Sequence, residues 1–200
     1  MIESQERRTS SCRPATVPER LIADAQRGSQ DAFAALYRVY EPPLRRYLET
    51  VAPDFAAEVS SATWESAARS LRGFSGDGDG LRAWLFTIAR RRLVDEVRRS
   101  VRRPLAVAEV PDTPTHELHD ISTGADWAVR VLAAIPTRQA DVVALRVIGG
   151  LGVQEVADLL GVTPENVRVL CHRGLNAIRG LLDPSTAADA GVVRELRSVV

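Results

Sequence analysis

Residues 150–182 of this chain, GLGVQEVADLLGVTPENVRVLCHRGLNAIRGLL, predict two short helices joined by a tight turn. The first helix covers 154–160 and ends at Gly161, because glycine takes the left-handed conformation of a helix C-terminus at no steric cost. Thr163 can cap the second helix, whose first residue, Pro164, has no amide hydrogen to leave unpaired. Such a helix-turn-helix places its second helix in the major groove of DNA. The alternative is an ordinary amphipathic helix with a solvated face.

The second helix of this unit divides into two faces, since side chains advance by about 100° per residue. Its inward face is apolar and comprises Val167, Leu170, Cys171, Gly174, Ile178 and Leu181. The opposite face carries Glu165, Val169, His172 and Asn176, with Arg168 and Arg173 on its flanks. Polar and apolar groups of this kind suit base edges, and arginine reaches phosphates or guanine. The pattern therefore favours DNA binding over a merely solvated face.

A second charged helix is predicted over 81–103, LRAWLFTIARRRLVDEVRRSVRR, with eight arginines against two acidic residues. Arg91 and Arg98 lie seven residues apart and share one polar face. A buried side with a row of guanidinium groups suits a helix that lies along a phosphate backbone. Trp84 and Phe86 could stack on unpaired bases, but aromatic residues at helical spacing more often belong to a core, which is the expectation here.

Charge is strongly segregated along the chain, although its formal net charge is zero. Residues 104–126 follow the arginine helix with five acidic residues, three prolines and no basic residue. This composition predicts an acidic, extended linker. Residues 1–17 are expected to be a disordered N-terminal tail and residues 183–200 a C-terminal tail.

The remaining residues also read as helices. Periodic apolar residues predict helices over 18–27, from about 30 to 50, and over 54–72, with Pro42 and Pro43 implying a kink or restart in the second. A glycine-rich loop, 73–80, precedes the arginine helix, and two further helices are expected at 127–135 and 138–147. No segment alternates like a strand. The expected fold is all-α, with one small helical domain over 18–103 and a second over 127–182.

Other kinds of site find little support in the residues. Cys12 and Cys171 form no disulfide framework, and His116 with His119 and neighbouring acids lacks two further convincing ligands, so no metal or cofactor is expected. Paired catalytic carboxylates, an activated nucleophile and a phosphate-binding glycine motif are not evident, so a small enzyme is disfavoured and no catalytic residue is assigned. Without a membrane span or signal peptide, the sequence predicts a cytoplasmic protein.

Two stretches resemble a known family. WLFTIARRRLVDEVRR at 84–99 looks like the promoter-melting helix, and IPTRQADVVALRVIGGLGVQEVADLLGVTPENVRVLCHRGL at 135–175 looks like the fourth domain, of bacterial sigma factors of the extracytoplasmic-function group. The resemblance covers about 23–182. It implies a non-catalytic transcription initiation factor that binds core RNA polymerase, recognises −10 and −35 promoter elements and assists melting. The rival interpretation is a helix-turn-helix regulator that is not a polymerase subunit.

The resemblance also implies roles for individual residues, by number in this sequence. The −10 region would be held by Arg90, Arg91, Arg98 and Arg99, with Phe74 and Ser75 in a loop beside a pocket for a flipped base. The −35 region would face Thr163, Glu165, Asn166, Arg168, Val169, His172 and Arg173. Core polymerase would be bound by Asp54, Glu58, Ser61 and Ala62. The implied partners are promoter DNA, the clamp region of the largest polymerase subunit and the flap of the second-largest, with an anti-sigma factor as a further candidate.

The chain departs from the family pattern at three places. Ser60, Ser61 and Ala62 stand where the polymerase-binding helix usually has stronger polar groups. Val169 replaces a polar residue on the DNA face and offers only an apolar contact, for example to a thymine methyl. Gly152 replaces the usual serine cap before the first helix of the helix-turn-helix, a loss of only a few tenths of a kcal/mol.

Overall fold

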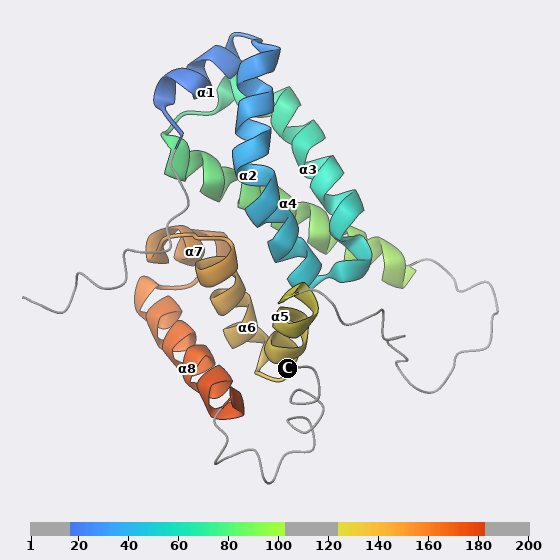
Figure 1. The fold of residues 1–200 in the computed structure, drawn as a ribbon, viewed down its shortest axis with the longest axis vertical. Coiled ribbons are helices and arrows are strands. Elements are labelled where there is room, and N and C mark those ends of the chain that lie inside the picture. The colour runs from blue at the N-terminus through green and yellow to red at the C-terminus, as the bar shows by residue number, and fades with distance from the viewer. Residues whose placement is uncertain (1–16, 103–123, 183–200) are drawn as a thin grey trace, which may run out of the picture.

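The protein is seen here in a computed structural model that describes residues 17–102 and 124–182. Four helices form an N-terminal module: α1 (Glu19–Gln26), α2 (Gln30–Val51), α3 (Ala56–Ser70) and α4 (Gly78–Arg102). Four more form a C-terminal module: α5 (Gly124–Ala133), α6 (Thr137–Val143), α7 (Val153–Leu160) and α8 (Pro164–Leu182). The described residues contain no strand, which confirms the all-α prediction (Figure 1).

Helix α2 does not restart at its two prolines, as the sequence had suggested it could. Pro42 and Pro43 lie inside one helix that runs from Gln30 to Val51. The residues on both sides of them belong to one buried face, with Tyr40 before the prolines and Leu44 and Tyr47 after them. Packing of this continuous face compensates for the amide hydrogens that proline lacks.

Helix α4 begins three residues earlier than predicted, at Gly78, and this shortens the glycine-rich loop. The cause is a cap that the periodicity of apolar residues does not reveal. The carboxylate of Asp77 accepts a hydrogen bond from the amide of Gly80 at 2.8 Å, and the Asp77 carbonyl accepts one from Leu81. An aspartate in this position satisfies amides that a helix N-terminus leaves unpaired. Helix α5 likewise begins at Gly124, inside the stretch predicted to be linker.

The turn of the helix-turn-helix has the predicted chemistry. Gly161 follows α7 with φ of 66°, in the left-handed region. The Thr163 hydroxyl accepts a hydrogen bond from the amide of Asn166 at 3.2 Å and so caps α8. At the start of α7, the Glu155 carboxylate accepts a hydrogen bond from the amide of Gly152, which is one half of a capping box; glycine has no side chain to make the other half. Between α6 and α7, a π-helical turn, η5 (Ala144–Ile148), ends α6 within its predicted range.

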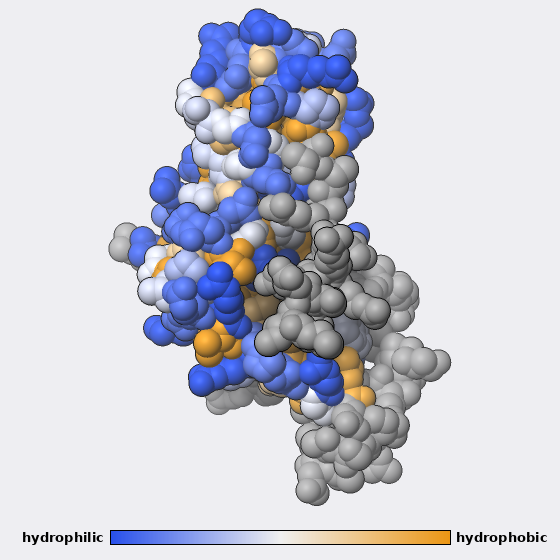
Figure 2. Space-filling view, turned by 90° about the vertical axis from the view of Figure 1, so that its left-hand side faces the viewer, coloured by the Kyte–Doolittle hydropathy of each residue, from blue (hydrophilic) through white to orange (hydrophobic). Residues whose placement is uncertain are grey.

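Both modules share one hydrophobic core. Buried residues of α2 and α4, such as Leu44 and Phe86, belong to the same cluster as Leu145 and Val156 of the C-terminal module. Helix α2 packs against α5 and η5, and α4 against α7 (Figure 1). On the face shown in Figure 2, hydrophilic side chains cover most of the described surface, and hydrophobic ones form small areas between them.

The N-terminal tail was predicted to include residue 17. Val17 is instead buried in the core, so this boundary of the prediction is wrong. The rest of that tail, nearly all of the acidic linker and the C-terminal tail lie outside the described residues.

Candidate nucleic-acid interface

The outer face of α8 carries the residues that the sequence places against DNA. Val167 and Gly174 are buried beneath it, and Leu170, Cys171, Ile178 and Leu181 pack against the core, as predicted. The opposite side is exposed and consists of Glu165, Asn166, Arg168, Val169, His172, Arg173 and Asn176, with Thr163 at the helix start. Val169 has 44% of its surface exposed, which leaves its methyl groups free for an apolar contact. The face assignment is therefore confirmed.

Side chains on this face contact one another along the helix. Arg168 pairs with Glu165 at 3.4 Å. The Asn176 amide nitrogen lies 2.9 Å from His172 Nε2, and Arg179 donates to the Asn176 oxygen at 2.7 Å. These contacts tie His172, Asn176 and Arg179 together along the exposed side of α8.

The arginines of α4 fall into distinct environments. Arg82 is buried, pairs with Asp79 at 3.0 Å and lies over the ring of Tyr40 at 5.6 Å. Arg92 donates to the Ser66 hydroxyl of α3 at 2.7 Å. These two hold the helix in the N-terminal module. Among the arginines of α4 whose side chains are described, Arg91, Arg98 and Arg99 are exposed, and Arg99 pairs with Glu96.

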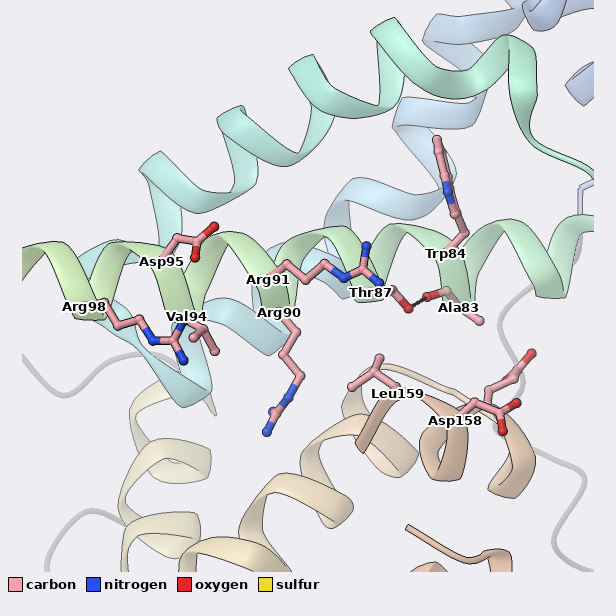
Figure 3. Close-up of a pocket in the computed structure, with 11 residues that line it drawn as sticks. Ala83, Trp84, Thr87, Arg90, Arg91, Val94, Asp95, Arg98, Asp158 and Leu159 are labelled. Carbon is pink, nitrogen blue, oxygen red and sulfur yellow. Dashed lines mark hydrogen bonds between the residues drawn. The ribbon is translucent and has the colours of Figure 1, made fainter. Parts of the chain in front are cut away.

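The fourth arginine assigned to DNA, Arg90, points instead toward the C-terminal module (Figure 3). Its guanidinium pairs with the Asp141 carboxylate of α6 at 3.1 Å, and both side chains have 29% of their surface exposed. Burial disfavours the charged guanidinium, but the neighbouring Asp141 carboxylate and Tyr47 hydroxyl outweigh it and raise the pKa of Arg90. Tyr47 lies fully buried in α2, and burial raises the pKa of its hydroxyl, an effect that Arg90 opposes.

A groove of about 710 Å³ opens between α4 and α7. Figure 3 shows Arg90, Arg91 and Arg98 on the α4 side, with Asp158 and Leu159 of α7 opposite. Glu155 also lines it from α7. Trp84 forms part of the wall and packs against Phe74 with ring centroids 5.3 Å apart, whereas Phe86 is buried in the core. The expectation that both aromatics are core residues is therefore confirmed for Phe86, while Trp84 is only partly buried.

The loop before α4 is held at both of its ends. The Gln26 amide of α1 donates to the carbonyls of Leu71 and Phe74, at 3.1 and 2.7 Å. Asp77 holds the other end as the cap of α4. Phe74 is half-buried against Trp84, and Ser75 is exposed.

Of the residues assigned to polymerase binding, Asp54 lies in the 3-10 turn Pro53–Phe55 before α3, and Glu58, Ser61 and Ala62 lie in the first half of α3. Asp54, Glu58 and Ser61 are exposed and Ala62 is half-buried. Ser61 also lines a depression of about 340 Å³ between α2 and α3, which is lined as well by the aromatic cluster of Phe33, Tyr37 and Trp64.

Glu41 of α2 organises that depression, and sequence reasoning missed it. Its carboxylate accepts hydrogen bonds from the Ser60 hydroxyl at 2.8 and 2.9 Å and from the Trp64 indole nitrogen at 2.6 Å. Ser60 is buried and its hydroxyl joins α3 to α2 through Glu41. It therefore does not belong to the exposed surface of α3 that is assigned to polymerase binding. No local pattern joins residues separated by about twenty positions, so only the tertiary structure reveals this contact.

Other kinds of site are not found in the described part of the chain. Residues 17–102 and 124–182 contain no cluster of three or more potential metal ligands, and the candidate ligands near His116 lie outside these ranges. None of the helices described there is long and apolar enough to cross a membrane.

Comparison with known proteins matches both modules to one family. The family profile described as Sigma-70 region 2 matches residues 36–103, and that described as Sigma-70, region 4 matches residues 125–178. The chain is 29% identical over 184 residues to the ECF RNA polymerase sigma factor ShbA of Streptomyces griseus, covering 84% of this chain and 96% of that one. It is 28% identical over 175 residues to SigD of Mycobacterium tuberculosis, covering 80% and 81%.

Solved structures with the same fold include two protein complexes. CnrH in complex with the cytosolic domain of CnrY matches with a TM-score of 0.59 and 21% identity, over 86% of this chain and 97% of that chain. RpoE in complex with the anti-sigma factor NepR from Bartonella quintana matches with a TM-score of 0.58 and 20% identity, over 79% and 98%. Because one family profile matches each of its two modules and its relatives are named as ECF sigma factors, the chain belongs to the sigma-70 family, as an RNA polymerase sigma factor of the extracytoplasmic-function group.

Proposed function

We propose that this protein binds core RNA polymerase in the cytoplasm and directs it to promoters by contacting two separate DNA elements. The observation that carries the proposal is the pair of DNA-suited surfaces in one chain, the exposed face of α8 and the arginine row of α4. The protein contributes no catalytic step in this role, since the polymerase performs the chemistry.

The −35 element is proposed to lie against α8. Arg168 and Arg173 flank the outer face and suit phosphates or guanine, and the exposed His172 between them would hydrogen-bond a base edge. Glu165 and Asn166 lie at the end of the helix that enters the groove, next to the Thr163 cap. Val169 contributes an apolar contact where the family usually has a polar residue. The preferred −35 sequence of this protein should therefore differ from that of typical family members.

The −10 element is proposed to lie along α4. Arg91, Arg98 and Arg99 are exposed and suit phosphates, and Arg90 joins them once it leaves Asp141. The loop with Phe74 and Ser75 would border the pocket for one flipped base. Flipping costs a few kcal/mol of unstacking, which phosphate contacts along the arginine row offset.

Core polymerase is proposed to bind through the start of α3. The exposed Asp54, Glu58 and Ser61, with Ala62 beside them, would dock on the clamp region of the largest subunit. The C-terminal module would bind the flap of the second-largest subunit. An anti-sigma factor is a further proposed partner, on the resemblance to sigma factors that form such complexes.

The test is in vitro transcription from a library of promoter fragments, with core polymerase and with or without this protein. Specific transcripts that require both components support the proposal. A protein that binds DNA tightly and specifically alone, and yields no specific transcript with core polymerase, would instead be a helix-turn-helix regulator.

A further inference from the structure

The side chain of Gln26 joins α1 to the loop that the proposed function places beside a flipped base. Its amide nitrogen donates to the Leu71 carbonyl at 3.1 Å and to the Phe74 carbonyl at 2.7 Å, across 45 and 48 positions of sequence. A primary amide carries two N–H donors, so one side chain can serve both carbonyls. The Leu71 carbonyl also accepts from the Phe74 amide at 3.0 Å. Gln26 therefore closes the turn from Leu71 to Phe74 from outside the loop.

Helix α1 provides a fixed support for this side chain. Ile22 and Ala25 are buried in the core. The helix packs on α2 and lies beside the short turn η4 (Leu71–Gly73) (Figure 1). Gln26 is the last residue of α1, and Gly28 follows in the left-handed region with φ of 96°. The backbone position of Gln26 is therefore set by α1 and not by the loop that its side chain holds.

The bond to Phe74 also sets the orientation of the peptide unit between Phe74 and Ser75. A carbonyl and the amide that follows it share one plane, and in a trans peptide they point in opposite directions. The described residues contain no cis peptide bond. Because the Phe74 carbonyl faces Gln26, the Ser75 amide points away from that side chain. Ser75 is exposed, so the loop presents this residue to solvent in one defined orientation.

The ring of Phe74 holds the same residue through its side chain. It packs on Trp84 of α4, with ring centroids 5.3 Å apart. A Cβ added at Gly76 would lie 2.9 Å from the Phe74 Cζ atom, and one added at Gly80 would lie 3.7 Å from it. The ring is thus enclosed by Trp84 and by two glycines of the same segment. Ser75 therefore lies between a fixed Phe74 and Gly76, which contacts the Phe74 ring.

We propose that Gln26 is a positioning residue for base selection in the −10 element, because it fixes the direction in which Ser75 meets a flipped base. The proposal rests on the proposed function for the identity of this ligand. A flipped base is read through hydrogen bonds to its edge, so the group that reads it must keep one orientation to favour one base over another. With the turn released, the arginines of α4 would still hold the phosphates. Gln26 therefore contributes to selectivity more than to affinity.

Gln26→Glu is the most direct test variant, because it keeps the length and shape of the side chain and replaces both donors with an acceptor. A carboxylate cannot donate to the two carbonyls. Gln30→Glu is the matched control, because Gln30 is exposed in the first turn of α2, where a negative charge is favourable. Circular dichroism checks that each variant is folded. If Gln26→Glu loses helicity, Gln26→Met replaces it, because methionine keeps an unbranched side chain and lacks the N–H donors.

Hydrogen–deuterium exchange of the full-length protein, without DNA or polymerase, tests whether Gln26 holds the loop. The backbone amides of residues 72–77 should exchange about ten-fold faster or more in Gln26→Glu than in wild type, because the turn opens more often. The same amides should keep the wild-type rate in Gln30→Glu, and the amides of α8 should keep it in both variants. Equal exchange of residues 72–77 in wild type and folded Gln26→Glu would overturn the inference.

Base selection is measured with holoenzyme reconstituted from core polymerase and each variant. The probes are fluorescein-labelled forked fragments of one promoter found in the transcription test, with each of the four bases in turn at every unpaired −10 position. At the flipped position, the ratio of affinities for the best and the worst base should fall roughly ten-fold in Gln26→Glu. It should stay at the wild-type value in Gln30→Glu. A purely structural role would lower all four affinities by one factor and leave the ratio unchanged.

The two experiments separate failure of the inference from failure of the proposed function. An unchanged ratio at every −10 position in folded Gln26→Glu would overturn the inference, even with faster exchange of the loop. A protein that yields no specific transcript with core polymerase would disprove the proposed function and the role in base selection with it. Faster exchange in Gln26→Glu would then show that the contact between α1 and the loop still stands.

Discussion

Gly174 of α8 lies against Val143 of α6, so close that an added Cβ would be 2.7 Å from the Val143 Cγ2 atom. The same Cβ would be 3.3 Å from the Gln139 Cβ. The absence of a side chain at Gly174 therefore allows α8 to pack on α6, and this packing sets the position of the DNA face.

Replacing Gly174 with alanine is expected to destabilise the protein by about 1–3 kcal/mol, because α8 must move away from α6. Gly180 is the matched control on the same helix, since an added Cβ there has nothing within 4 Å. Gly180→Ala should stabilise by roughly 0.5–1 kcal/mol, because alanine favours a helix. Urea unfolding followed by circular dichroism measures both changes. Equal effects of the two substitutions would show that the close approach is not maintained in solution.

Two buried tyrosines of α2 should respond differently to loss of their hydroxyls. Tyr40 donates to the Gly78 carbonyl at 2.8 Å, so Tyr40→Phe should lower the free energy of unfolding by about 0.5–1.5 kcal/mol. The Tyr47 hydroxyl has no hydrogen bond of normal geometry among the described residues and only lies near Arg90, so Tyr47→Phe should cost less than Tyr40→Phe. The same unfolding measurement compares them, and a larger loss for Tyr47→Phe would contradict the assignment.

Alkaline pH should weaken the fold through these same residues. Burial raises the pKa of Tyr47 and of Tyr40 above the ordinary value of 10.0. The stability that this shift contributes is fully present below the unfolded pKa, and it is lost as pH rises from there through the folded pKa. Tyr47→Phe should therefore show a shallower loss of unfolding free energy between about pH 9 and 11 than wild type. Parallel curves for the two proteins would count against a raised pKa at Tyr47.

Arg168→Ala and His172→Ala should each reduce initiation from a −35-dependent promoter on the order of ten-fold or more, because each removes a group facing the duplex. Both side chains are exposed on α8, so the fold should be preserved. Arg27→Ala, at the exposed end of α1, is the control for loss of one arginine. Single-round transcription with core polymerase measures the effect. Normal initiation by both α8 variants would mean that another face of α8 contacts the DNA.

Arg91→Ala should slow promoter opening more than it weakens −35 binding. Arg91 is exposed on α4, whereas the −35 contacts belong to α8. Permanganate footprinting follows opening of the duplex, and filter binding follows the closed complex. Arg38→Ala, on the exposed side of α2, controls for the lost charge. Opening at the wild-type rate by Arg91→Ala would remove Arg91 from the −10 contacts.

Local chemistry made much of this fold predictable. Gly161, Thr163 and Pro164 predict the turn of the helix-turn-helix, because the preference of each depends only on the backbone next to it. In the structure Gly161 ends α7, Thr163 caps α8 and Pro164 is the first residue of α8, as predicted. The division of α8 into faces follows from helical periodicity alone. The cap at Asp77 was missed, although an aspartate before a helix is a local signal, because the glycines around it indicated a longer loop.

Contacts between distant residues could not be predicted in this way. Arg90 has the same local sequence context as Arg91, yet one is paired across the modules and the other is exposed. The difference depends on where α6 packs, and no pattern in residues 84–99 contains that information. The same holds for Glu41, whose partners are contributed by another helix.

The loop at Phe74–Asp77, tied to α1 by Gln26 and to α4 by Asp77, is preorganised before any ligand arrives. A base captured beside it would meet backbone that has already lost its conformational freedom, so little ordering entropy opposes binding. The same rigidity makes the length of this segment critical. One inserted residue would separate the Gln26 anchor from the Asp77 cap and leave this segment as an ordinary surface loop.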